Sequence, residues 1–394
     1  MIGRTLLPAT LIAIALSVSA CGGGKATTGP KAASQGLPPA NPIAVQRMVE
    51  GVTAARDPRM RERAIALLRE AISIDPNLWE ARFDLGVVLA NGGDLANAEE
   101  QLRSAAKTAP DREEVAVALA EVRRRRGSNR DAASSLEDFV KDHPGAVEAR
   151  TLLVTALRDS GQHDRAIQNA REVLVRKPGD ATALAELALC HLGKGERDTA
   201  QLLVKQALDV NAKSAVAHRV QGLVHLGGGD DALAFQAFSK AAQEDPRDTT
   251  SRLNMGAVLL RAGAYVKAAE QYKSALAAAP DDTAAQIGLA AALRGESEGK
   301  NTKQLEEAKS LLEKVLEREP HNIAANFNLG ILYADAFKKT SEAKPFFERF
   351  LDDAPKDHPS RPEAERQLKT ASAASAAPAA PAPPPATPAA GGKK

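Results

Sequence analysis

Residues 81–110 read ARFDLGVVLANGGDLANAEEQLRSAAKTAP, and a variant of the same stretch, SRLNMGAVLLRAGAYVKAAEQYKSALAAAP, occupies residues 251–280. Apolar residues in the first copy recur three and four positions apart, as in Leu85, Val88 and Leu89, which is the spacing of one helix face. A glycine interrupts this pattern near the middle of each copy, and a proline closes it. Each stretch therefore predicts two helices joined by a short turn.

The marks of this helix pair recur every 34 residues along most of the chain. Three sets of positions follow the period in phase, and Ala212 fills the one vacant proline position. They are Pro76, Pro110, Pro144, Pro178, Pro246 and Pro280; Gly93, Gly127, Gly161, Gly195, Gly229 and Gly263; and Ala64, Ala98, Ala132, Ala166, Ala200, Ala234 and Ala268. Such a period is typical of a solenoid whose units bury their apolar faces against one another.

Each set of positions has a physical reason. The glycine, as at Gly93, ends a first helix, because the turn into the second needs a left-handed conformation that glycine adopts at little cost. The alanine, as at Ala98, lies where the two helices cross, and its small side chain lets the backbones approach. The proline, as at Pro110, stops the second helix. The sequence therefore predicts alternating first and second helices throughout the repeat region.

This pattern resembles the tetratricopeptide repeat, a 34-residue helix-turn-helix unit. The residues that carry the resemblance in one unit are Leu85, Gly86, Leu89, Ala98, Leu102, Ala105 and Pro110; in another they are Met255, Gly256, Leu259, Ala268, Tyr272, Ala275 and Pro280. The resemblance implies an all-α, right-handed superhelical solenoid of about nine units, which with a final capping helix occupies residues 44–372.

The period is interrupted in three places. The first unit is degenerate in its opening helix, and the eighth carries six additional residues within Gly295–Gln304, which we expect to bulge from a turn. The last unit slips by one residue before Ala343. Beyond it, Ser360-Arg361-Pro362-Glu363 is typical of a capping box that opens a last, solvent-facing helix.

The N-terminal 20 residues predict a signal peptide, with Arg4 before an apolar run too short to span a bilayer comfortably. The run ends in Val18-Ser19-Ala20-Cys21, which resembles a bacterial lipobox; the resemblance implies that Cys21 is lipidated and becomes the first mature residue. An ordinary secretory signal is the alternative. Gly22, where an aspartate would retain a lipoprotein in the inner membrane, favours the outer membrane facing the periplasm. Residues 21–43 are expected to form a flexible tether.

Composition narrows the classes of function. Residues 373–394 are rich in alanine and proline and are expected to form a disordered tail, either a spacer or a ligand for a proline-reading partner. The formal net charge of +2 gives no reason to expect nucleic-acid binding, which requires a concentrated basic field.

Motifs of catalysis are not found in the sequence. There is no His-Glu-x-x-His, no phosphate-binding glycine loop and no nucleophile elbow, so we expect neither an enzyme nor a cofactor. His191 and His225 occupy equivalent positions of adjacent repeats, with His218 nearby, so a metal or small-ligand site is an alternative to plain packing. Cys190 is expected to be a small buried residue.

The resemblance also implies a binding groove on the first helices. Its family positions map here to Arg124, Arg125, Arg158, Arg219, Arg261, Asn254, Asn328, Phe83 and Phe327, with Glu121 beside them. The asparagines resemble groove residues that grip the backbone of extended peptides in related solenoids. Asp84 stands where such an asparagine would be expected and departs from the pattern. The run Arg123–Arg126 also fits a simpler role, since cations stabilise a helix C-terminus.

These features together predict a membrane-anchored scaffold that binds protein partners and assists the assembly of an envelope complex of motility, pilus or secretion type. The layout resembles the tetratricopeptide lipoproteins of gliding motility. An accessory protein that docks a cell-wall enzyme, and a metal or small-ligand binder acting through the histidines, remain alternatives.

Overall fold

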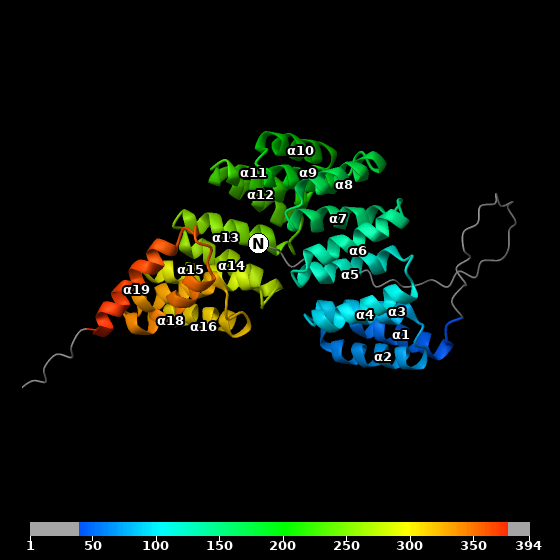
Figure 1. The fold of residues 1–394 in the computed structure, drawn as a ribbon, viewed down its shortest axis with the longest axis horizontal. Coiled ribbons are helices and arrows are strands. Elements are labelled where there is room, and N and C mark those ends of the chain that lie inside the picture. The colour runs from blue at the N-terminus through cyan, green and yellow to red at the C-terminus, as the bar shows by residue number, and fades with distance from the viewer. Residues whose placement is uncertain (1–38, 377–394) are drawn as a thin grey trace, which may run out of the picture. The chain divides into compact units, whose positions relative to one another are not determined.

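The computed structural model describes residues 39–376, the side chains of 371–376 excepted (Figure 1). Within this range every regular element is helical. Nine helix pairs and a last helix follow one another, which confirms the all-α repeat solenoid. The predicted signal peptide, Cys21 and nearly all of the tether and tail lie outside the described residues. No helix within residues 39–376 is both long and apolar enough to cross a membrane.

The chain divides after Glu244 into two compact units, here called the N-terminal unit (residues 39–244) and the C-terminal unit (residues 245–376). The N-terminal unit contains α1 (Pro42–Ala55), α2 (Arg61–Ile74), α3 (Trp79–Asn91), α4 (Leu95–Thr108), α5 (Glu113–Arg125), α6 (Asn129–Asp142), α7 (Val147–Asp159), α8 (His163–Arg176), α9 (Ala181–Gly193), α10 (Arg197–Val210), α11 (Ala215–Gly227) and α12 (Asp231–Glu244). The C-terminal unit contains α13 (Thr249–Arg261), α14 (Tyr265–Ala278), α15 (Thr283–Ser297), α16 (Thr302–Arg318), α17 (Ile323–Ile331), α18 (Thr340–Asp353) and α19 (Arg361–Ala376).

The ends of the solenoid differ slightly from the predicted bounds. Helix α1 begins at Pro42, two residues before the predicted start, and the degenerate sequence of this unit still forms a helix of 14 residues. Asn41 caps it by accepting a hydrogen bond from the N–H of Ile43. Helix α19 continues to Ala376, beyond the predicted end at residue 372.

The turns between first and second helices follow the glycine grid. The six grid glycines have positive φ, from +70° at Gly263 to +90° at Gly93. A Cβ added at Gly93 would meet no atom within 4 Å, so the position requires glycine for its backbone conformation rather than for space.

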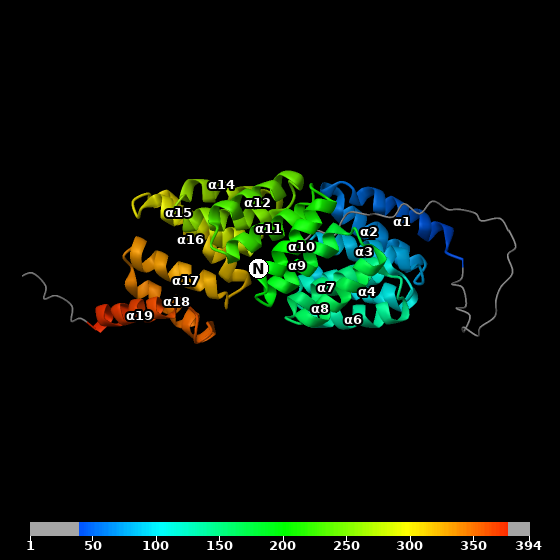
Figure 2. The same ribbon diagram turned by 90° about the horizontal axis from the view of Figure 1, so that it is seen from above.

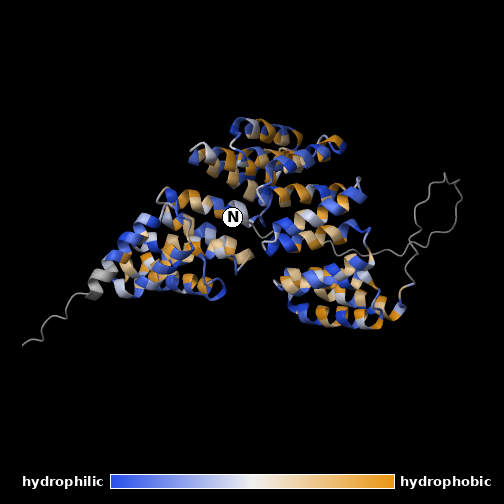
Figure 3. Cartoon of the chain, viewed as in Figure 1, coloured by the Kyte–Doolittle hydropathy of each residue, from blue (hydrophilic) through white to orange (hydrophobic). Residues whose placement is uncertain are grey.

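The alanine grid marks the helix crossings. All seven alanines of the grid are fully buried. The small residue in the facing first helix is equally necessary, because a Cβ at Gly222 would lie 2.4 Å from Cε1 of Phe238. Most helices show hydrophilic and hydrophobic residues side by side along their length (Figure 3), as expected when one face of each helix packs against its neighbours.

Replacement of Ala200 by leucine should overpack the contact between α10 and α9. We expect the free energy of unfolding to fall by about 1–3 kcal/mol, because neighbouring side chains must leave their preferred rotamers. Urea denaturation followed by circular dichroism measures the change. Gln206→Leu places the same side chain on an exposed position of α10 and should change stability by less than about 0.5 kcal/mol. An unchanged midpoint for Ala200→Leu would mean that the helices cross elsewhere.

The six additional residues of the eighth repeat do not form the predicted bulge. Relative to α13 and α14, helix α15 is longer by two residues and α16 by three. The turn of residues 298–301 gains only the remaining residue, and it places Glu298 and Gly299 at positive φ. Extending both helices satisfies more backbone hydrogen bonds within the helices than a longer loop would.

The one-residue slip of the ninth repeat is absorbed inside its first helix. Residues Leu332–Ala336 continue α17 as a π-helical turn, which accommodates one extra residue without breaking the helix. Lys338 then adopts φ of +56° at the place where other repeats have glycine. The second helix therefore starts in its regular place.

The predicted capping box at the start of α19 is not formed. The carboxylate of Glu363 accepts hydrogen bonds from Arg366 and Gln367, and the N–H of Ser360 donates to Nδ1 of His358. The helix nevertheless begins next to Ser360, because the Ser360 carbonyl accepts from the N–H of Ala364. Fully buried Ala364 fixes α19 against α18 as a cap on the last repeat.

The first helices form the inner layer of each unit. Successive first helices contact one another, as α5 contacts α7, α9 contacts α11 and α13 contacts α15. All six helices are labelled in Figure 1, and α7, α9, α11 and α15 are also labelled in Figure 2. Contacts between successive second helices are at most marginal in the part of the chain that the structure describes. A groove for a partner is therefore to be sought on the first helices, separately in each unit.

Candidate functional site

The arginine run at the end of α5 makes ion pairs with acidic residues of the same chain. Nε of Arg123 lies 3.1 Å from Oε1 of Glu99, and Arg126 pairs with the same carboxylate. Arg103, one turn further along α4, donates to it at 2.6 Å. Burial raises the pKa of Glu99, but the three arginines outweigh it and hold the pKa below its usual range. These contacts join the second and third repeats.

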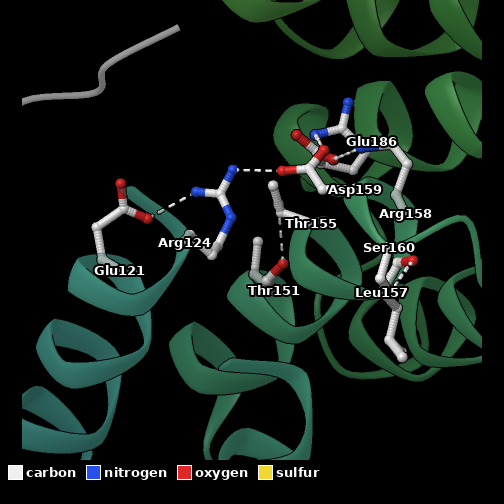
Figure 4. Close-up of polar contacts among 9 residues, drawn as sticks. All are labelled: Glu121, Arg124, Thr151, Thr155, Leu157, Arg158, Asp159, Ser160 and Glu186. Atoms are coloured by element: carbon white, nitrogen blue, oxygen red, sulfur yellow. Dashed lines mark hydrogen bonds and ion pairs between the residues drawn. The ribbon is translucent and has the colours of Figure 1, made fainter. Parts of the chain in front are cut away.

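Arg124 is buried and ion-paired twice. Its Nη1 lies 2.7 Å from Oε2 of Glu121 in the same helix, and its Nη2 lies 2.6 Å from Oδ2 of Asp159 on α7 (Figure 4). Burial lowers the pKa of Arg124, but the two carboxylates raise it by more, so the guanidinium stays charged. Arg124 therefore joins the third repeat to the fourth.

The pairing continues into the fifth repeat. Nη2 of Arg158 lies 3.1 Å from Oδ1 of Asp159, and its Nε lies 3.4 Å from Oε2 of Glu186 on α9 (Figure 4). Acids and bases thus alternate across α5, α7 and α9. Arg124 and Arg158, which the sequence predicted as partner contacts, hold neighbouring repeats together.

The remaining predicted arginines lie at three different places. Nη2 of Arg125 donates to the Ala90 carbonyl at 2.7 Å, near the end of α3. Arg219 is half-buried on α11, and Arg261 is exposed at the end of α13. Each of the three also takes part in a further polar or electrostatic interaction. Arg261 belongs to the C-terminal unit and the other four predicted arginines to the N-terminal unit, where Arg124, Arg125 and Arg158 contact neighbouring repeats.

Both predicted aromatic contacts belong to the packing. Phe83 is 8% exposed and lies edge-on to Trp79, with ring centroids 6.5 Å apart. Phe327 is half-buried, with its centroid 5.1 Å from that of Phe350 and 6.4 Å from that of Phe347. The mapping of family positions placed these rings in a groove, whereas burial of their large apolar area holds them against neighbouring helices.

The two predicted asparagines lie on first helices of the C-terminal unit. Asn254 on α13 is half-buried, and its side chain makes no hydrogen bond to another described residue. Asn328 on α17 is also half-buried, and its Nδ2 donates to the Ala324 carbonyl at 2.9 Å. Ala257 is exposed on the same face of α13, and Ala291 is half-buried at the equivalent position of α15. Small side chains between amides leave room for an extended backbone.

Family models agree with this assignment of the repeats. One tetratricopeptide repeat model matches residues 59–122, 157–224 and 302–368, and a second tetratricopeptide repeat model matches residues 117–181. The first of them alone matches half of the chain. The chain belongs to the tetratricopeptide repeat family. It is accordingly an interaction scaffold of the tetratricopeptide type, a class that binds proteins.

Solved structures to which the chain is similar have low sequence identity to it. The Cut9–Hcn1 hetero-tetramer of APC/C is 16% identical, with a TM-score of 0.54; the match covers 79% of this chain and 59% of that one. A tetratricopeptide protein of Thermus thermophilus is 24% identical, covering 46% and 99%, with a TM-score of 0.43. The pilus biogenesis factor PilW is 17% identical, covering 52% and 96%, with a TM-score of 0.44. No curated protein sequence matches the chain.

The histidines of this tetratricopeptide chain have separate surroundings. Nδ1 of His191 lies 2.6 Å from Oε2 of Glu196, and Nε2 of His218 lies 2.9 Å from the Ala212 carbonyl. His225 is half-buried on α11. Within residues 39–376, no group of three His, Cys, Asp or Glu side chains is arranged to hold a metal ion. Cys190 is fully buried as expected, and burial is the main reason that its pKa rises to about 12.

One buried carboxylate of this tetratricopeptide chain was not expected from the sequence. Asp84 on α3 is 5% exposed, and burial followed by the charge of Glu80 raises its pKa to about 7. The sequence shows only that an aspartate stands where the family pattern has an asparagine. The structure adds that this carboxylate is buried, which changes its pKa.

Proposed function

We propose that this chain is a lipid-anchored scaffold of the bacterial cell envelope that holds an extended segment of a protein partner. In this proposal it assists the assembly of an envelope complex of motility, pilus or secretion type. The lipobox-like Val18–Cys21 and Gly22 support an anchor in the outer membrane, with the repeats facing the periplasm. Membership of the tetratricopeptide family supports the binding of proteins.

The observation that carries the proposal is the arrangement of amides on the C-terminal unit. Asn254 and Asn328 lie two repeats apart on the inner layer. The Asn254 amide makes no hydrogen bond to another described residue, and the Asn328 amide donates one N–H to the Ala324 carbonyl and keeps its other N–H and its oxygen for a ligand. An extended peptide exposes one donor and one acceptor per residue, and a side-chain amide satisfies both. The small Ala257 and Ala291 let the peptide backbone approach the helices.

The Asn254→Ala/Asn328→Ala variant should lose its partner without losing its fold. We expect cross-linking in cells of the source organism, followed by mass spectrometry, to recover a defined set of envelope proteins with the wild type. Recovery should fall about tenfold with the variant, the factor that corresponds to one or two lost hydrogen bonds. Gln168→Ala/Gln206→Ala, which removes two exposed amides from second helices, is the matched control.

If the wild type and the Asn254→Ala/Asn328→Ala variant recover the same envelope proteins in equal amounts, the partner binds outside α13, α15 and α17. If the partner is a cell-wall hydrolase or synthase, the scaffold acts as the accessory of an enzyme. The variant avoids Arg124 and Arg158, since replacing these would disturb the contacts between repeats.

The anchor has its own test. Cys21→Ala should abolish lipid attachment, because the sulfur that receives the acyl chains is gone. We expect that a palmitate analogue fed to the cells no longer labels the variant, and that the variant is no longer recovered with the membranes as a lipidated protein. Cys190→Ala removes a buried thiol and should leave labelling intact. Persistent labelling of Cys21→Ala would refute the lipoprotein assignment.

A further inference from the structure

Asp84 differs from the other buried carboxylates of the described chain. Glu99 is held by three arginines, Glu121 by Arg124 and Glu186 by Arg158, while Asp282 accepts from the N–H of Ala285. Asp84 is 5% exposed and makes no hydrogen bond or ion pair with any residue of 39–376. The Asp84 oxygens are not among the fully enclosed side-chain atoms that lack a partner, so they reach the surface of the unit, where a ligand can supply the donor that the described chain does not.

The surroundings of Asp84 are acidic. Glu80 lies one turn earlier on the same face of α3 and is half-buried. Burial raises the pKa of Glu80, and the nearby charges of Asp75 and of Glu114 on α5 raise it further. Arg112 is the cation that acts on Glu80, but its guanidinium lies over the Trp79 ring, 5.2 Å from the centroid. Negative charge is thus concentrated where α3 adjoins α5.

Asp84 also lies where a partner would be expected to pass. It occupies the inner-layer position of α3 that corresponds to Asn254 on α13, five repeats of 34 residues earlier. In the proposed function, this position of the C-terminal unit presents an amide to an extended backbone. In the N-terminal unit it presents an acid, which recognises a different group.

We propose that Asp84 and Glu80 form a subsite for one cationic side chain, lysine or arginine, of a protein segment bound along the first helices of the N-terminal unit. The inference rests on the proposed function only in that the ligand is a protein segment. An ammonium or guanidinium supplies the N–H donors that Asp84 lacks, and its charge favours the ionised carboxylate. A neutral aliphatic side chain would cover the Asp84 carboxylate and take it from water without giving it a donor.

Selection of peptides from a random 12-residue phage library on the immobilised full chain tests this subsite. We expect lysine or arginine to be enriched at one position with the wild type. Asp84→Asn keeps the shape of the side chain and should reduce that enrichment about tenfold, as expected for the loss of a charge-assisted hydrogen bond. Asp138→Asn removes an exposed carboxylate on α6 and should keep the enrichment. Selected peptides without a cationic preference, or an equal preference with Asp84→Asn, would overturn the proposal.

A second measurement separates failure of this subsite from failure of the proposed function. Butylammonium chloride carries the charged end of a lysine side chain, and the carboxyl carbon signal of Asp84 in an NMR spectrum reports its ionisation. At pH 7 we expect a saturable change with butylammonium and none beyond the ionic-strength effect with sodium chloride. If no peptide is selected but the saturable change occurs, the subsite stands and the peptide groove fails. If both salts act alike, the subsite does not exist.

Discussion

Asp84→Asn is expected to raise the free energy of unfolding of the N-terminal unit by about 2–4 kcal/mol at pH 8, and to change it little at pH 4. Burial raises the pKa of Asp84 from its ordinary value of 3.8 to about 7 in the folded chain. One pKa unit corresponds to about 1.4 kcal/mol, so a shift of this size sets the upper end of the range. Below pH 4 both states bind the proton, and Asp84 has no penalty.

The sign of the pH dependence follows from the raised pKa. Between pH 4 and 7 the folded state keeps a proton that the unfolded state has released, so stability falls as pH rises through this window. Above pH 7 both states are ionised and the penalty is complete. The amide of the Asp84→Asn variant cannot ionise, so the variant lacks this part of the pH dependence. The difference between wild type and variant removes the contributions of all other titrating groups.

Tryptophan fluorescence during urea denaturation measures this difference. Trp79, the only tryptophan of the chain, lies in α3 and reports on the repeat that contains Asp84. The other charged groups on the helices packed against α3 are present in both proteins; they include Glu50 and Arg47 on α1, Glu70 on α2, Glu99 on α4, and Glu114 and Arg125 on α5. Asp138→Asn should shift stability by less than about 0.5 kcal/mol at either pH. Identical curves for wild type and Asp84→Asn would mean that the Asp84 carboxyl has a donor or is well hydrated.

The repeat grid was predictable because its causes are local. A glycine at positive φ, an alanine at a helix crossing and a proline after a helix each act within a few residues, so the sequence displays them directly. The sequence predicted the position of the insertion near Gly295 correctly. It did not predict its form, since the additional residues lengthen two helices instead of bulging from a turn. Choosing between a longer loop and longer helices depends on packing against neighbouring repeats, which a single sequence does not reveal.

The candidate site was less predictable because charge pairing acts between repeats. Arg124 finds Asp159 35 residues away, and Arg126 finds Glu99 in the preceding repeat. The family positions predicted correctly which helix carries each groove candidate, but they did not predict which residues its side chain contacts. Phe83 shows the same limit, since an aromatic ring at a groove position is drawn into the core when there is apolar surface to cover.

Arg124→Met is expected to lower the free energy of unfolding by about 3–5 kcal/mol, because the substitution removes the cation that Glu121 and Asp159 share in a buried place. The side chains of Arg124, Glu121 and Asp159 are 9%, 8% and 14% exposed, so water does little to solvate the remaining charges. Urea denaturation followed by circular dichroism measures the loss. Asp159→Asn in the Arg124→Met background should recover part of it, and the double-mutant cycle gives the coupling between the two.

The matched control for Arg124→Met is Arg165→Met, which breaks an ion pair of similar chemistry at the surface. Arg165 on α8 pairs with Glu137 on α6, with side chains 54% and 32% exposed. Solvent screening should hold the cost of this change below about 1 kcal/mol. A comparable cost for both variants would mean that burial adds nothing to the Arg124 contacts. A negligible cost for Arg124→Met would mean that Arg124 does not stabilise the fold. The substitution should then weaken partner binding, as the sequence-based assignment of Arg124 to the groove predicts.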